Sequence, residues 1–372
     1  MDPVLPATLP LICPRCRHLS ERGWEMHTVS LTACHRQHPD GDVLEGTLTC
    51  DHPACAAAYP ILDGIPILVA DLAGLVRAQG LLLVERDLHP ATAALLAAEG
   101  PDDEPYPRLL EHLSIYLDAH WGDQATPPPD GPGAERGPLG LAELMARLGA
   151  RAAAPVDWAV ELGASVGRGL AELARGARHV VGIDLHFGAL RRARRLLRGE
   201  PLDYPRRVIG RHYQTATIHP TRAAPIPRLG APDDPSAPGA SLALLCGDAL
   251  DPPLVPRRFG RVAALHLLDS VRSPATLLAV ADKLCAPAGE LLLSSPFSWQ
   301  SGVVDEAERL GAADPAGELC RRLTAGQGLE AHYRIEERAD LAWWLRRDQR
   351  SAHLYSTCYL RATKLPPTTP TS

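Results

Sequence analysis

Short apolar runs and helical patterns alternate along the middle of the chain. Two apolar runs, Trp158–Leu162 and Val180–Ile183, are typical of buried strands, and the helical pattern between them covers about Gly169–Gly176. Three further strands are predicted at Ser241–Leu245, Arg261–Leu268 and Glu290–Ser294, with a helix at Pro274–Leu284 and a turn at Ala288-Gly289. This order predicts an α/β fold with a mainly parallel sheet and helices on both faces.

The residues before this region follow other patterns. Helices are predicted at Asp71–Asp87, Pro90–Glu99, Pro107–Trp121 and Leu139–Leu148, with a Pro/Gly-rich loop over 126–138. We therefore expect four parts: a small β domain (1–70), a helical linker or lid (71–150), the α/β domain (151–366) and a disordered tail (367–372). The α/β domain holds a long insert, 199–240, whose second part is Pro-rich.

Composition narrows the function classes. The chain has 372 residues, a formal net charge of −6 and nine cysteines. Its acidic balance argues against binding nucleic acid over its whole surface. No apolar run approaches the roughly 18 residues that a membrane span needs, so we expect a cytoplasmic protein without a membrane partner. The oligomeric state is left open.

Two cysteine pairs lie in the first part of the chain. Cys13 and Cys16 form a CxxC pair, and Cys50 and Cys55 form a second, wider pair. Four thiolates on two turns are the ligands of a tetrahedral structural zinc site. The segment between the pairs contains three competing ligands, namely Cys34, His35 and His38.

The sequence around these cysteines resembles a known family. CPxC, a later cysteine pair and the tail Tyr59–Leu68 (YPILDGIPIL) resemble the small zinc-ribbon proteins that activate tRNA methyltransferases. The tail itself predicts a hairpin, because Asp63-Gly64 is a turn dipeptide and Pro66 suits a strand edge.

The turn Gly163–Gly167 (GASVG) between the first two strands fits three chemistries. A nicotinamide-dinucleotide fingerprint is excluded because Ser165 and Arg168 stand where glycines are needed. GxSxG is also the nucleophile elbow of hydrolases, with Ser165 as nucleophile. We disfavour that interpretation because no earlier strands of the same sheet are predicted before Val156.

The third chemistry accounts for more residues. Glu161 precedes the turn and Asp184 ends the next strand, so Asp184 is placed to accept the ribose hydroxyls of S-adenosylmethionine (SAM) while Glu161 faces its cationic methionine part. The pattern resembles the class I SAM-dependent methyltransferases, which implies a Rossmann-like seven-stranded sheet. The resemblance also implies an antiparallel strand pair from Leu329–Ile335 and Ser351–Thr363, around Asp340–Arg347.

The resemblance assigns the cofactor residues. Asp248, after the third strand, matches the acid that contacts the adenine amino group. The predicted SAM-binding set is Glu161, Gly163, Ala164, Ser165, Gly167, Asp184, Leu185, Asp248, Ala249 and His266. Four segments, GASVGR, GDA, LDSVRSP and SPFSW, further resemble the methyltransferase domain of the ovothiol-biosynthesis enzyme, which implies N-methylation of a histidine-derived small molecule.

The candidate acceptor-facing residues are His266, Asp269 and Tyr213, because the end of the fourth strand faces the methyl group in this family. His112, Tyr116 and His120 share one helix face and either pack on the core or form a lid over the ligand. The basic insert residues Arg206, Arg207, Arg211, His212 and Tyr213 could bind a carboxylate or phosphate.

The sequence therefore predicts an enzyme that transfers a methyl group from SAM to a small-molecule nitrogen, with a structural zinc ion. An RNA methyltransferase is the first alternative, disfavoured by the acidic charge and by Leu268-Asp269-Ser270-Val271 in place of an Asn/Asp-Pro-Pro-aromatic motif. A non-catalytic SAM-binding or partner-activating protein is the second. The acceptor itself is not predicted.

Overall fold

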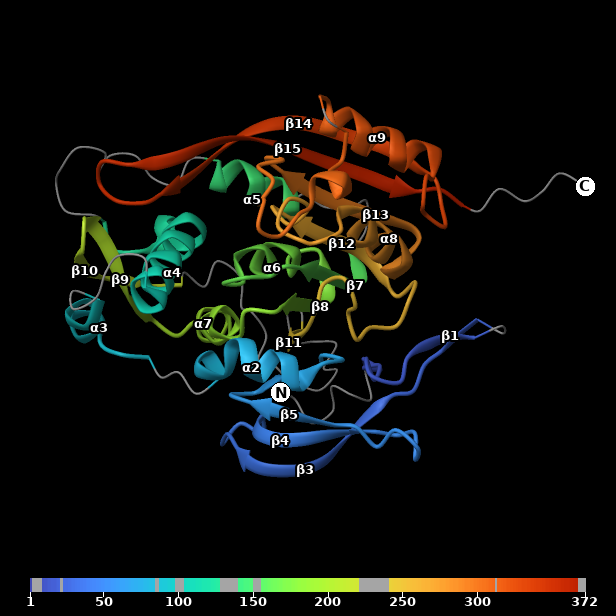
Figure 1. Cartoon of the computed structure of the whole chain (residues 1–372), viewed down its shortest axis with the longest axis horizontal. Helices are drawn as coiled ribbons and strands as arrows, with labels where there is room; N and C mark the ends of the chain where they lie inside the picture. Colours follow the sequence, from blue (N-terminus) through green and yellow to red (C-terminus); the bar gives the residue numbers. More distant parts are fainter. Residues whose placement is uncertain are drawn as a thin grey trace, which may run out of the picture.

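A seven-stranded mixed sheet lies at the centre of the molecule (Figure 1). The computed structural model describes residues 1, 9–20, 23–83, 87–97, 104–127, 140–149, 155–220, 241–311 and 313–366. The strand order is β11-β8-β7-β12-β13-β15-β14, and β15 runs in the opposite direction to the other six strands of this sheet. The bounds are β7 (Val156–Leu162), β8 (Ala177–Asp184), β11 (Ser241–Cys246), β12 (Phe259–Leu265), β13 (Cys285–Ser295), β14 (Tyr333–Arg346) and β15 (Ala352–Lys364).

Two apolar cores cover the two faces of this sheet. Along β7, Trp158 and Val160 point into one core and Ala159 into the other, as the period of two in a strand requires. The first core is closed by α8 (Pro274–Leu284) and α9 (Pro315–Ala325), and the second by α5 (Leu141–Gly149), α6 (Arg168–Leu173) and α7 (Phe187–Leu197). The predicted α/β arrangement with a largely parallel sheet is confirmed.

Three predicted boundaries are wrong. β12 stops at Leu265, because His266 has a left-handed backbone (φ 50°) that a strand cannot contain. The expected turn Ala288-Gly289 lies inside β13. The segment Asp340–Arg347 belongs almost wholly to β14, which begins only at Tyr333, so the antiparallel pair is longer than the sequence suggested.

The N-terminal residues form a separate four-stranded sheet of β3 (Val29–Gln37), β4 (Val43–Cys50), β5 (Ala58–Leu62) and β6 (Ile65–Pro66), preceded by the hairpin β1 (His18–Ser20) and β2 (Gly23–Glu25). Asp63 and Gly64 both have positive φ, as the predicted hairpin turn requires. Just after β6, Ile67 bridges Cys246 in parallel and the Leu68 amide donates to the Cys246 carbonyl at 2.8 Å. The small sheet thus covers the β11 edge of the large one.

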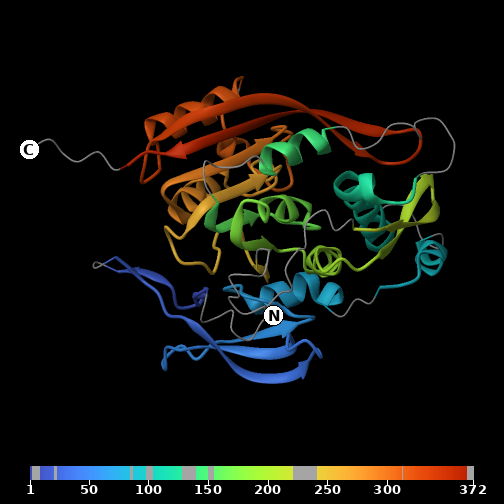
Figure 2. The same ribbon diagram turned by 180° about the vertical axis from the view of Figure 1, so that it is seen from behind.

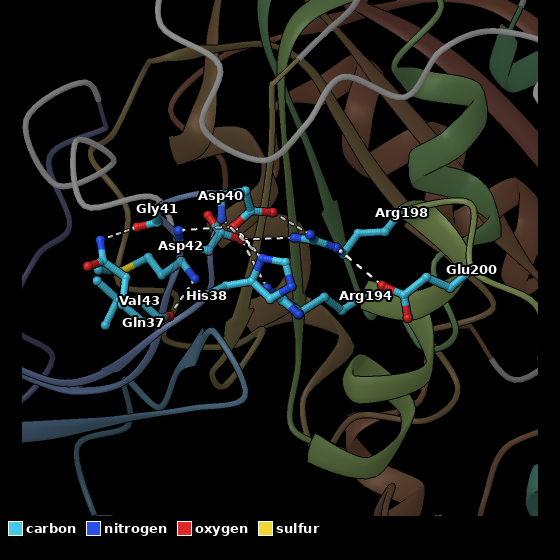
Figure 3. A network of polar contacts seen from close by, with 10 residues as sticks. Gln37, His38, Asp40, Gly41, Asp42, Val43, Arg194, Arg198 and Glu200 are labelled. Carbon is cyan, nitrogen blue, oxygen red and sulfur yellow. Dashed lines mark hydrogen bonds and ion pairs between the residues drawn. The ribbon is translucent and has the colours of Figure 1, made fainter.

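Charged side chains complete the junction between the two sheets (Figure 3). Asp42 is only 2% exposed and accepts hydrogen bonds from Arg194 (2.9 Å) and Arg198 (3.1 Å) of α7. Arg198 also donates to Asp40. Because these arginines belong to the large domain and the aspartates to the β3–β4 connection, the ion pairs fix the N-terminal sheet against α7.

Three α-helices, two 3-10 turns and a hairpin surround the rest of the sheet. The helices are α2 (Leu72–Leu83), α3 (Pro90–Ala97), α4 (Pro105–Trp121) and the 3-10 turns η1 (Gly122–Gln124) and η2 (Glu306–Glu308). The first part of the long insert forms the hairpin β9 (Leu202–Ile209) and β10 (His212–Ile218), on which α3 and α4 pack (Figures 1 and 2). The Pro-rich parts of the expected loop and insert, and the tail 367–372, lie outside the described residues.

The described helices include none with the length and apolar character of a membrane span.

Candidate active site

The glycine-containing turn after β7 has the backbone that its sequence demands. Gly163, Ser165 and Gly167 have φ values of 75°, 46° and 82°, which only glycine adopts without strain. The amides of Gly163 and Ala164 both donate to the Ile183 carbonyl of β8. A β-carbon on Gly163 would lie 2.9 Å from the Leu267 side chain, so the turn is closely packed against the end of β12.

Asp184, the last residue of β8, holds this turn. Its Oδ2 accepts from the Ser165 amide at 2.8 Å, and its Oδ1 accepts from the His186 amide at 2.7 Å. Each carboxylate oxygen keeps a second lone pair for a ligand. Burial raises the pKa of Asp184, and these two amides oppose the shift. The carboxylate is thus oriented by main-chain groups rather than by a cation.

Glu161 lies beneath the same turn and is 3% exposed. The Leu170 amide of α6 donates to its carboxylate, while Oε2 has no hydrogen-bond partner among the described residues. Burial, and then the charge of Asp184, raise the pKa of Glu161 to about 8. An incompletely paired buried carboxylate is a favourable neighbour for a cationic ligand.

The third predicted acid, Asp248, follows the adjacent strand β11, where Cys246 is the register partner of Asp184. Its Oδ1 accepts from the Leu250 amide at 2.8 Å, and the exposed Arg272 lies 3.4 Å from Oδ2. Leu185, next to Asp184, is 40% exposed, which is high for a leucine. An exposed apolar side chain beside an acid suits the flat face of an adenine ring.

The predicted cofactor residues therefore come from the carboxyl ends of β7, β8, β11 and β12. Three of these strands are immediate neighbours, and β12 adjoins β7. This edge of a parallel sheet is where ligands bind in open α/β folds. The donor set fits SAM, because Glu161 retains an unpartnered oxygen and Asp184 is preoriented; its assignment to SAM stays a prediction.

Two of the three candidate acceptor-facing residues lie together after β12. The His266 amide donates to the Ser294 carbonyl at 2.8 Å, which fixes the strained backbone. Its Nε2 is buried and has no partner among the described residues, and the same is true of Oδ1 of Asp269, while Oδ2 of Asp269 accepts from the Ser298 amide at 2.9 Å. Two unpartnered polar atoms at one strand end are a feature of ligand sites.

The structure places the third candidate, Tyr213, elsewhere. It lies on β10 in a small apolar cluster with Ala93 of α3 and Leu110 of α4. The insert arginines are also engaged: Arg206 pairs with Asp118, and Arg207 with Glu111. These ion pairs fasten the hairpin to α4, so the expectation that Arg206 and Arg207 recognise a carboxylate or phosphate is corrected.

Helix α4 presents His112, Tyr116 and His120 toward the strand ends. His112 stacks on His186 beside Asp184, at a centroid distance of 5.5 Å. Burial raises the pKa of Tyr116, and the charges of Tyr355, Asp184 and Asp269 raise it further. The lid interpretation of this helix face stays a prediction beside packing on the core.

Contacts with the glycine turn fix α4 in this position. Arg168, the first residue of α6, forms a two-pronged ion pair with Asp123 of η1, at 2.9 and 3.0 Å. The Trp121 indole donates to the Val166 carbonyl at 3.0 Å. The turn and the helix above it are thus connected directly.

The four predicted zinc ligands come together. The Sγ atoms of Cys13, Cys16, Cys50 and Cys55 all lie within 4.8 Å of one another. The Cys13–Cys55 and Cys16–Cys50 separations are 3.9 and 3.5 Å, close to the about 3.8 Å that tetrahedral Zn–S bonds of about 2.3 Å imply. The donor set fits zinc.

The competing ligands lie elsewhere. Cys34 is exposed, His35 approaches the Thr47 hydroxyl, and His38 pairs with Asp40. A residue that the sequence did not indicate, His27, lies with Nδ1 3.5 Å from the Cys16 sulfur. Because His27 lies outside both cysteine pairs, its position in the sequence did not indicate that it is near the cluster.

Comparisons with known proteins give distant likenesses only. The chain matches no protein-family model and no curated protein. Among solved structures, phosphoethanolamine N-methyltransferase 2 of Haemonchus contortus, in complex with SAM, is 16% identical with a TM-score of 0.27, over 41% of this chain and 27% of that chain.

Two further structures are similar over more of their length. A complex between the Haloferax volcanii Trm112 methyltransferase activator and a putative methyltransferase is 14% identical (TM-score 0.38), over 76% of this chain and 100% of that chain. A putative SAM-dependent methyltransferase from Listeria monocytogenes is 13% identical (TM-score 0.35), over 57% and 92%. The activities, ligands and partners named are those of the compared proteins.

Proposed function

We propose that this chain is a SAM-dependent methyltransferase that acts on a nitrogen of a small molecule, an amino-acid or imidazole derivative. The observation that carries the proposal is the row of acids at adjoining strand ends, in which Asp184 is oriented by the amides of Ser165 and His186. SAM, when bound, supplies an electrophilic methyl group on a sulfonium.

The chain's own residues have distinct roles in this proposal. Asp184 accepts the ribose hydroxyls, Asp248 accepts the adenine amino group, and Leu185 and Ala249 pack on the base. Glu161 offers its unpartnered oxygen to the cationic methionine part. His266 and Asp269 line the acceptor side. The protein contributes mainly alignment, which is worth up to roughly 7–11 kcal/mol in such displacements.

The cysteine cluster is proposed as a structural zinc site. Four thiolates leave no open coordination position for a substrate, so the ion would stabilise the knuckles that contact the large domain. Metal analysis of the full chain should find one zinc per molecule, and the double variant Cys13→Ser/Cys16→Ser should lose it. Zinc retained in that variant would refute the ligand set.

Calorimetry with SAM and S-adenosylhomocysteine tests the main proposal. Wild-type chain should bind both ligands, and Asp184→Ala should weaken binding by roughly a hundredfold, because two charge-assisted hydrogen bonds are lost. Asp157→Ala is the matched control, since Asp157 is exposed at the other end of β7. No binding by the wild-type chain would refute the proposal.

A methyl-transfer screen identifies the acceptor class. Amino-acid derivatives, imidazoles and RNA are offered in parallel with labelled SAM. We expect label in a small amine or imidazole. Label in RNA would favour the RNA-methyltransferase alternative, and SAM binding without any transfer would favour the non-catalytic one.

A further inference from the structure

A continuous arc of six rings extends across the site from the cofactor end to the acceptor end. In order, its members are His186, His112, Tyr116, His120, Trp343 and His266, and neighbouring centroids lie 5.5, 4.3, 6.0, 5.5 and 4.6 Å apart. They come from the segment after β8, from α4, from β14 and from the end of β12. Four elements far apart in sequence thus supply one wall.

Carboxylates lie at both ends of this arc. His186 is two residues from Asp184, and His266 is three residues from Asp269. Asp269 is 4% exposed, and its Oδ1 has no hydrogen-bond partner among the described residues. The buried Nε2 of His266 is likewise unpartnered. The acceptor end therefore holds one carboxylate oxygen and one imidazole nitrogen that a ligand could satisfy.

Two histidines at the acceptor end of the arc, His266 and His120, do not supply positive charge. Burial, and then the neighbouring His120, lower the pKa of His266 to about 3. Burial and Arg168 lower the pKa of His120 to about 4. Both rings are neutral near pH 7, so neither compensates a negative charge on Asp269. Burial raises the pKa of Asp269, and the Ser298 amide opposes that shift.

Two buried arginines near the ring arc, within the described part of the chain, are engaged with other carboxylates. Arg168 is bound to Asp123 and lies 3.6 Å from Glu172, and Arg206 is bound to Asp118. An anionic acceptor needs a cation to receive it. An ammonium or imidazolium, by contrast, is attracted both by the aromatic faces and by a carboxylate.

Resting on the proposed function, we propose that the acceptor binds as a nitrogen cation, an alkylammonium or imidazolium group, between the ring arc and Asp269. Asp269 accepts a proton from this cation and leaves a neutral nitrogen. The lone pair of that nitrogen then attacks the methyl group; the C–N bond forms as the C–S bond breaks, and the electron pair of that bond stays on sulfur. Trp343 selects for the positive charge.

A charge series at nearly constant shape tests this proposal. Histamine, 4-ethylimidazole and imidazole-4-acetate are titrated calorimetrically into the full chain saturated with S-adenosylhomocysteine, at about pH 7.5, where their side groups are cationic, neutral and anionic. We expect histamine to bind roughly tenfold more tightly than 4-ethylimidazole and imidazole-4-acetate to bind most weakly.

Variants separate charge from shape. Asp269→Asn keeps an oxygen for the Ser298 amide and should remove the advantage of histamine over 4-ethylimidazole while S-adenosylhomocysteine affinity stays unchanged. Trp343→Leu should weaken histamine binding by roughly tenfold, and Trp343→Phe should restore most of it.

The two proposals fail in different ways. If S-adenosylhomocysteine does not bind, the proposed methyltransferase function fails. If it binds but the three probes bind equally, the anion binds best, or none binds, the acceptor proposal is overturned and the methyltransferase function stands. A histamine preference that survives Asp269→Asn also overturns it.

Discussion

Two regions of this molecule bury carboxylates in opposite ways. At the domain junction, Asp42 is almost fully buried and is saturated by Arg194 and Arg198 (Figure 3). At the strand ends of the large sheet, Glu161 and Asp269 are about as deeply buried, yet each keeps an oxygen that has no partner in the described part of the chain. A buried charge costs free energy unless it is paired. The saturated site is therefore structural, whereas the unsaturated one fits the ligand site that we propose.

The largest effect is expected from breaking the saturated site. Asp42→Ala leaves Arg194 and Arg198 facing each other at the junction without their shared partner, which should cost about 3–5 kcal/mol of unfolding free energy. Urea denaturation followed by circular dichroism measures it. Asp71→Ala is the control, because Asp71 is largely exposed and should change stability by less than about 0.5 kcal/mol. Equal effects of the two variants would contradict a structural junction.

The unsaturated site should respond in the opposite direction. Glu161→Gln still offers an oxygen to the Leu170 amide but removes the buried charge, so the ligand-free protein should be as stable as wild type or more so near pH 8. The affinity for SAM should fall by roughly tenfold to a hundredfold, because one charge-assisted contact of about 1.5–3 kcal/mol is lost. Destabilisation together with unchanged SAM affinity would show that Glu161 is only structural.

The two regions should make the unfolding free energy depend on pH in opposite directions. The pKa of Glu161 is raised to about 8 in the folded chain, so the folded state holds a proton that the unfolded state has released. Unfolding free energy should therefore fall as the pH rises from about 4.5 to 8, by at most about 1.4 kcal/mol per pKa unit. Glu161→Gln should flatten this fall.

Asp40 at the junction has the contrary shift. Burial opposes ionisation there, but hydrogen bonds from Arg198, the Asp42 amide and His38 hold the pKa of Asp40 below its ordinary value. Its contribution is present above about pH 4 and is lost as the pH falls further. Denaturation curves from about pH 3 to 8 should show that the unfolding free energy of the wild type falls both toward acidic and toward basic pH. Asp40→Asn should reduce only the fall toward acidic pH.

The sequence was sufficient for the features that depend on local pattern. The mainly parallel α/β sheet, the turn at Gly163–Gly167 and the convergence of Cys13, Cys16, Cys50 and Cys55 follow from periodicity and spacing, because each is determined within a few residues or by one pairing rule. The antiparallel strand pair was implied only by the family resemblance. The junction was not predictable: Asp42 gains its meaning only when α7 is placed beside the β3–β4 connection.

The ring arc could not be predicted from the sequence for the same reason. Trp343 is an ordinary strand residue until the β14–β15 pair extends over the carboxyl ends of the parallel strands (Figures 1 and 2). The sequence predicts that His112 and His120 share one face of a helix. What that face contacts depends on the packing of α4 near His186. Tyr213 is a candidate acceptor-facing residue by its side-chain chemistry alone. Its packing with Ala93 and Leu110 depends on the positions of α3 and α4.

The smallest effect is expected at Asp248, which lies between the two extremes. One oxygen accepts from the Leu250 amide, and the other is 3.4 Å from Arg272, a largely exposed side chain. Exposed pairs contribute about 0–1 kcal/mol, so Arg272→Ala should leave stability nearly unchanged. The affinity for SAM should rise by up to about threefold, because the adenine amino group then no longer has to compete with the Arg272 guanidinium for Asp248. Weaker binding in calorimetry would instead make Arg272 a contact of the nucleotide, and the site would then be partly saturated like the junction.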